Sequence, residues 1–191
     1  MTDYKNIRGK KVKFLTSDLD NAQGEGQIFY SDTDSEYKVA IASGAWSAGS
    51  NLITNRKNGS GFGPSTAAAF AGGQVTTPSQ NLTEEYNGFG WTTGGNLNTA
   101  RTQLAGTTAG SQTAGLVFGG NPPLIADTFE YNGSAWSEGG DLNTARQDGI
   151  GVGLQTAALA LGGQPRNGTA DDAVESYNGS SWTELAEYNT A

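Results

Sequence analysis

Alternating carboxylates near the start of the chain are the residues whose type and spacing best suit a chemical role. Asp32, Asp34 and Glu36 alternate along the chain, as do Asp18 and Asp20. Oxygen ligands at such spacing are what Ca²⁺ prefers. The DTDSEY segment nevertheless lacks the glycine and the distant glutamate of an EF-hand loop. We therefore interpret these carboxylates as solvated turn residues and expect no metal site, with calcium binding at the first three as the alternative.

Catalysis is restricted by two absences from the 191 residues, which contain no histidine and no cysteine. Ser-His-Asp and Cys-His nucleophiles and Cys/His zinc sites therefore cannot form. No motif places a pair of carboxylates for hydrolysis. The sequence thus predicts a protein with no catalytic residues and no cofactor.

Charge and hydropathy also exclude classes of partner. The formal net charge is −8 and only 11 residues are Lys or Arg, which argues against nucleic acid and anionic membranes as partners. No segment approaches 18 consecutive apolar residues, and the N-terminus lacks the apolar stretch of a signal peptide. We expect no membrane insertion.

Aromatic side chains return at a fixed interval and permit two interpretations. Their faces could stack on sugar rings, but large aromatics recurring once per repeat are typical of packing between repeats. We favour packing. The residues are Trp46, Trp91, Trp136 and Trp182, spaced 45, 45 and 46 residues apart, with Tyr86, Tyr131 and Tyr177 before the last three.

The interval belongs to a longer repeated phrase that must position these residues. Residues 85–101 read EYNGFGWTTGGNLNTAR and residues 130–146 read EYNGSAWSEGGDLNTAR; residues 175–191 and, more weakly, 44–56 repeat the pattern. A period of about 45 residues indicates a repeat protein. Because each unit is too short to bury its own apolar face, neighbouring units must cover one another.

Each unit reads as short strands separated by turns. In the unit after Arg101, the apolar run 114–120 ends in a Gly pair, and 128–132 alternates apolar and polar residues. Asn132-Gly133 then predicts a tight turn before Trp136. The pattern predicts about four strands per unit and no helix, so the fold class is all-β.

The ordered set of Gly-Gly, Tyr, Trp and Arg resembles the kelch repeat. The resemblance covers about residues 44–191 and implies a β-propeller, or an arc of one, with about four four-stranded blades. It also implies that the Arg is a structural donor to backbone between blades, which suits a guanidinium with five donors. The matching positions outside the aromatic residues are Gly72, Gly73, Gly119, Gly120, Gly162 and Gly163, with Arg56, Arg101 and Arg146.

The first 43 residues are expected to form a separate β segment. They read either as a degenerate first blade, with units at 8–55, 56–100, 101–145 and 146–191, or as docking hairpins. The segment GQIFYSDTDSEYKVA resembles a short hairpin of bacteriophage tail fibre and appendage proteins. Together with the kelch-like units, it makes the whole chain similar to structural proteins of marine tailed phages.

This resemblance predicts a non-enzymatic virion protein, tail-associated or part of a surface appendage. Its expected location is the virion. Its expected partners are other virion proteins or copies of itself, with a host surface glycan as a further partner. The Asn-, Thr-, Ser- and Gly-rich loops suit contact rather than catalysis. The alternative is a free kelch propeller module that binds glycan or protein.

Overall fold

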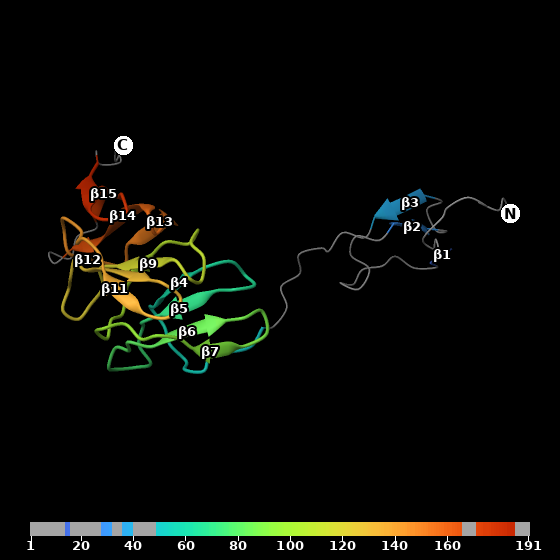
Figure 1. Cartoon of the computed structure of the whole chain (residues 1–191), viewed down its shortest axis with the longest axis horizontal. Coiled ribbons are helices and arrows are strands. Elements are labelled where there is room, and N and C mark those ends of the chain that lie inside the picture. Colours follow the sequence, from blue (N-terminus) through green and yellow to red (C-terminus); the bar gives the residue numbers. More distant parts are fainter. Residues whose placement is uncertain (1–13, 16–27, 32–35, 40–48, 166–170, 186–191) are drawn as a thin grey trace. The chain divides into compact units, whose positions relative to one another are not determined.

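The chain is all-β throughout the part that the structure, a computed structural model, describes: residues 14–15, 28–31, 36–39, 49–165 and 171–185 (Figure 1). Its contacts divide it into two compact units, Met1–Ala48 and Gly49–Ala191. Within the described ranges, no helix is long and apolar enough to span a membrane.

The N-terminal unit contains a small sheet of three described strands, β1 (Phe14–Leu15), β2 (Ile28–Ser31) and β3 (Glu36–Val39). The pair β2–β3 is an antiparallel hairpin, whereas β1 runs parallel to β2. This pattern differs from that of the kelch-like units, so the described strands form three sheets of the repeated kind rather than four. Asp18, Asp20, Asp32, Asp34 and Trp46 lie outside the described residues.

The larger unit consists of three antiparallel sheets that follow one another along the chain. In the first two sheets the four strands lie side by side in sequence order. In the third, the long β14 pairs with both β12 and β13 as well as with β15. The first sheet has β4 (Ser60–Phe62), β5 (Ala69–Ala71), β6 (Thr83–Tyr86) and β7 (Trp91–Thr93). The second has β8 (Ala105–Gly106), β9 (Gly115–Phe118), β10 (Thr128–Tyr131) and β11 (Trp136–Glu138). The third has β12 (Arg146–Gln147), β13 (Ile150–Leu154), β14 (Ala157–Pro165), β15 (Asp171–Tyr177) and β16 (Trp182–Glu184).

Asn-Gly turns join the last two strands of each sheet. In the second sheet, the Asn132 side-chain oxygen accepts the backbone N–H groups of Ser134 and Ala135, and Gly133 has a φ of 91°. A positive φ suits glycine, and an Asn side chain readily bonds its own turn. These contacts aim Trp136 back along Tyr131, with which it pairs across the two strands. The other two sheets repeat the turn.

The hydrophobic core lies between consecutive sheets. Because side chains alternate across a strand, each sheet has two faces. We call the face with the Tyr–Trp pair, which turns toward the preceding sheet, the leading face, and the opposite one the trailing face. One buried cluster joins the trailing face of the first sheet to the leading face of the second, and a similar cluster joins the second to the third.

Candidate functional site

The Tyr–Trp pairs of the second and third sheets pack on the sheet before them. Trp136 meets Phe62 of the first sheet edge-on, with ring centroids 5.9 Å apart. Trp182 meets Phe118 of the second sheet in the same way at 4.8 Å. Trp91 of the first sheet is only partly buried, and its indole nitrogen donates to the Ser50 carbonyl at 3.1 Å. Trp136 and Trp182 thus pack against the preceding sheet at the two described junctions.

The indoles of Trp136 and Trp182 also donate hydrogen bonds across their junctions. Trp136 Nε1 donates to Thr83 Oγ1 and to the Gly95 carbonyl, both at 2.9 Å, and Trp182 Nε1 donates to Thr128 Oγ1 at 2.8 Å. A buried indole N–H needs such an acceptor, because burial without one costs free energy. The threonines therefore fix the orientation of one sheet on the next.

The tyrosine hydroxyls form a second bond across each junction. Tyr131 donates to the Glu85 carboxylate at 2.6 Å, and Tyr177 donates to the Glu130 carboxylate at 2.7 Å. Burial, strengthened by the hydrogen bond to the neighbouring carboxylate, raises the pKa of each of these tyrosines to about 12. Both hydroxyls therefore remain neutral donors at ordinary pH.

Stability is expected to fall as the pH rises from 10 to 12. In the unfolded chain tyrosines ionise near pH 10, whereas folded Tyr131 and Tyr177 keep their protons to about 12. The unfolded state binds fewer protons in this window, so raising the pH favours it, by roughly 1 kcal/mol per pH unit for each tyrosine. Urea unfolding across this range measures the slope. A Tyr131→Phe/Tyr177→Phe variant should show a shallower fall, and an unchanged slope would contradict the assignment.

A glutamine makes a third link across each junction. It lies in the loop between β8 and β9 in the second sheet and in the turn between β13 and β14 in the third. Gln112 donates to the carbonyls of Ala68 and Tyr86 in the first sheet, both at 2.9 Å. Gln155 donates to Gly115 and Tyr131 in the second sheet, both at 3.1 Å. Nothing in the repeated phrase around the Trp points to these glutamines. An alignment of the units on their Gly pairs would have placed both at the same position, seven residues before the first glycine.

The arginine side chains bond within their own sheets, which corrects the expectation that they bridge consecutive units. Arg56 donates to the carbonyls of Gly72 and Leu82 and pairs with Glu84 at 2.9 Å. Arg146 donates in the same way to Gly162 and Ala173 and pairs with Glu175. Burial lowers the pKa of Arg56 from its usual value, partly offset by the nearby Glu84 carboxylate.

The link between units comes instead from the arginine backbone. The carbonyl of Arg101 accepts the N–H of Gly73 at 2.7 Å, and that of Arg146 accepts the N–H of Gly120 at 2.9 Å. These glycines have φ values of 92° and 100°, which aim their N–H groups at the next unit. The Gly pair and the arginine therefore act together at each junction.

Gly95 is a position where the next sheet comes too close for any side chain. A Cβ built there would lie 1.9 Å from the Ser134 carbonyl oxygen. We expect Gly95→Ala to lower the free energy of unfolding by about 2–3 kcal/mol through overpacking. Gly90→Ala is the matched control, since a Cβ there meets nothing within 4 Å, and it should change stability by less than about 0.5 kcal/mol. Equal effects in chemical denaturation would contradict the close approach.

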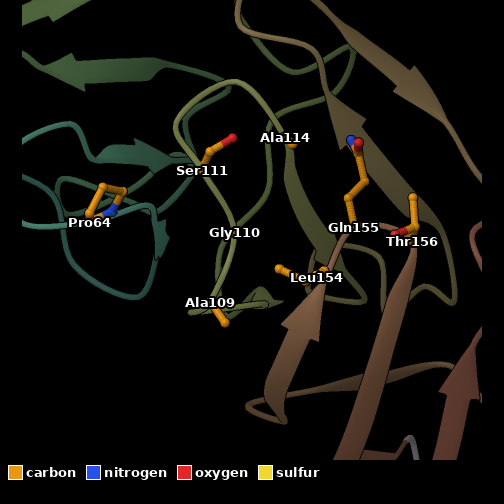
Figure 2. Close-up of a pocket in the computed structure, with 8 residues that line it drawn as sticks. All are labelled: Pro64, Ala109, Gly110, Ser111, Ala114, Leu154, Gln155 and Thr156. Carbon is orange, nitrogen blue, oxygen red and sulfur yellow. The ribbon is translucent and has the colours of Figure 1, made fainter.

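A pocket of about 490 Å³ lies where loops from all three sheets meet (Figure 2). Figure 2 shows Pro64 on one loop, Ala109 to Ala114 on the next, and Leu154 at the end of β13 with Gln155 and Thr156 in the turn that follows. The lining contains no charged residue, and the Gln155 amide already serves the junction. Only the hydroxyls of Ser111 and Thr156 offer polar side-chain contact beyond that amide, so the pocket suits a small uncharged group. The lining residues are Pro64, Ala109, Gly110, Ser111, Ala114, Leu154, Gln155 and Thr156.

Within the described ranges, no three His, Cys, Asp or Glu side chains are grouped so that they could hold a metal ion. Of the residues considered for calcium, only Glu36 falls in a described strand, β3. The carboxylates Glu84, Glu85, Glu130 and Glu175 serve the structural bonds described above.

Comparison with known proteins bears on the fold alone. No protein-family model and no curated protein matches the chain. Among solved structures, the chain is similar to the structure of YjhT, with a TM-score of 0.55 and 12% sequence identity. The match covers 83% of this chain and 51% of that one, so this chain spans about half the length of that structure. The likeness and the geometry together establish an all-β array of consecutive antiparallel sheets.

Proposed function

We propose that the protein is a non-enzymatic structural component of a bacteriophage virion, tail-associated or part of a surface appendage, that acts through protein–protein assembly. The non-enzymatic part of the proposal is supported by the repeated polar side chains of the chain, because their hydrogen bonds and ion pairs are structural. Tyr131, Trp136 and Arg146, with their partners, hold sheets together or brace a sheet from within. The repeat therefore serves as a scaffold that presents loops and end faces for binding.

The scaffold that we propose is an arc of a kelch-type β-propeller. In such a fold the first strands of all blades converge on an axis. Close approach of β4, β8 and β13 supports this arrangement: a Cβ at Gly106 would lie 2.2 Å from Ser60 Oγ, and one at Gly151 would lie 2.5 Å from the Gly106 carbonyl oxygen. A parallel bridge between Thr107 and Gly151 joins the second and third sheets there.

Assignment to a virion rests on the sequence resemblance to phage appendage proteins, which includes the segment that forms the β2–β3 hairpin. Mass spectrometry of gradient-purified particles from the encoding phage tests the assignment. We expect the chain in a fixed ratio to the other particle proteins. Its recovery only from the particle-free supernatant would overturn the proposal.

A free binding module is the second candidate, and the pocket in Figure 2 favours it because its lining suits an uncharged ligand such as part of a glycan. Glycan-array binding by the chain, abolished by Thr156→Trp in the pocket wall and kept by Val75→Asp outside it, would support this candidate. Binding that the pocket variant leaves intact would count against it.

A further inference from the structure

The trailing face of the third sheet exposes apolar side chains at positions that are buried in the first sheet. Ile150 and Val152 of β13 are 62% and 37% exposed. On the following strand, Ile150 pairs with the residue just before the Gly pair, and Val152 pairs with the residue two positions earlier. Ser60 and Phe62 of β4 make the same two pairings in the first sheet, where they are 7% and 3% exposed beneath the next sheet. Leu185, just after β16, adds to the exposed apolar surface. This face therefore has the position of a junction face, and no described sheet follows it along the chain.

The same face lacks the acceptors that the internal junctions use. Val174 pairs with the residue before the Gly pair, as Thr128 does in the second sheet, so a valine replaces the hydroxyl that receives an indole. Two residues on, Ser176 stands where Glu130 stands, and its own hydroxyl contacts the Thr183 carbonyl at 3.4 Å. A buried indole and phenol seated as in the internal junctions would lose both partners.

Leu185 adds a steric difference. Its counterparts in the repeated phrase are Gly94 and Gly139, where a Cβ would lie 2.8 and 2.6 Å from the hydroxyls of Tyr131 and Tyr177. A tyrosine placed in that way would therefore collide with the Leu185 side chain. The face suits an apolar partner that brings no hydroxyl to this point.

The leading face of the first sheet offers such a partner. The Tyr86 hydroxyl donates to Gly88 in its own turn and Trp91 Nε1 donates to the Ser50 carbonyl, so both groups already have an acceptor within the chain. Phe89 stands where the other turns have serine and is 90% exposed. In place of the linking glutamine, this unit has Ser65. The first sheet thus presents aromatic surface with its hydrogen bonds already made.

We propose that these two faces bind each other between two copies of the chain, head to tail. Each copy gives its first-sheet leading face to one contact and its third-sheet trailing face to the other. Two identical contacts then close a ring of six sheets, as a heterologous interface does when its rotation closes. In one chain Ile150 and Val152 on one face and Phe89 beside the other are exposed, and the match to the YjhT structure covers 51% of that structure. The inference rests on the propeller arc proposed above.

Light scattering after size exclusion of the full chain tests the proposal. Two copies of 19.7 kDa predict a single species of about 39 kDa. Ile150→Asp places a charge in the contact and should raise the dissociation constant at least about 100-fold, since burying an uncompensated charge is costly. Val75→Asp is the matched control, because Val75 is 46% exposed in the loop between β5 and β6 and belongs to no strand of either face. A monomeric parent, an open polymer, or a dimer that Ile150→Asp leaves intact would overturn the proposal.

Engineered cysteines identify the faces, because the chain has no cysteine of its own. Single variants Phe89→Cys and Leu185→Cys should give a disulfide-linked pair chiefly when they are mixed. A covalent pair that each variant forms equally well alone would overturn the head-to-tail arrangement. These results are independent of the virion assignment: a dimer absent from particles would refute that assignment alone, and a particle-bound monomer would refute this inference alone.

Discussion

Glu175→Gln is expected to lower the free energy of unfolding by about 3–5 kcal/mol, because it removes the carboxylate that neutralises a buried arginine. The Arg146 and Glu175 side chains are both almost fully buried, and their charged atoms are 2.5 Å apart. Glu175 also accepts the backbone N–H of Asn143 at 2.7 Å, so the substitution weakens a second contact. Urea unfolding measures the loss, with an unchanged denaturant slope as the check that the folded state is the same.

The second sheet shows how the fold accommodates an apolar residue at this position, and it suggests a double substitution as the control. There Phe129 stands where Glu175 stands, and Arg101 turns to the Pro122 carbonyl instead. A buried pair replaced by apolar residues can cost little, whereas removal of one partner costs much. We therefore expect Arg146→Met/Glu175→Phe to lose less stability than the sum of its two single substitutions. Additive losses would contradict a direct interaction between the two side chains.

Trp136→Ala is expected to cost about 3–5 kcal/mol, since it empties the centre of the first junction. The indole packs edge-on against Phe62 and donates to Thr83 and Gly95. Trp136→Phe separates the two contributions: it keeps an aromatic ring but leaves Thr83 without its donor, so we expect a loss of about 1–2 kcal/mol. Thermal and urea unfolding of both variants provide the measurement. A loss below about 1 kcal/mol for Trp136→Ala would show that the junction does not depend on this side chain.

The local structure of each unit was predictable from its sequence. The alternation of apolar and polar residues over 128–132 predicts the strand that is observed as β10. The Asn132-Gly133 pair predicts the turn that returns Trp136 to the sheet. These features depend on neighbouring residues, so they can be inferred without knowing the tertiary arrangement. The N-terminal unit was harder, because a parallel β1–β2 pair has no turn signal to mark it.

The partners across the junctions could not be predicted in the same way. Tyr131 and Glu85 are 46 residues apart, and their contact depends on which face of each strand meets the neighbouring sheet. A comparison of the repeats position by position holds the relevant signal. Glu85 and Glu130 fall at the same position, whereas Ser176 replaces them in the third unit. That difference has meaning only once the faces are known.

The second and third sheets each dock through a tyrosine and a tryptophan on the sheet before them. A double-mutant cycle between Tyr177→Phe and Glu130→Gln tests this claim most directly, because the two side chains belong to different sheets and meet at 2.7 Å. We predict a coupling energy of about 1–2 kcal/mol. The matched cycle pairs Glu130→Gln with Tyr131→Phe, whose hydroxyl bonds Glu85 instead, and should give less than about 0.5 kcal/mol. No coupling between Tyr177 and Glu130, or equal coupling in the two cycles, would contradict the account.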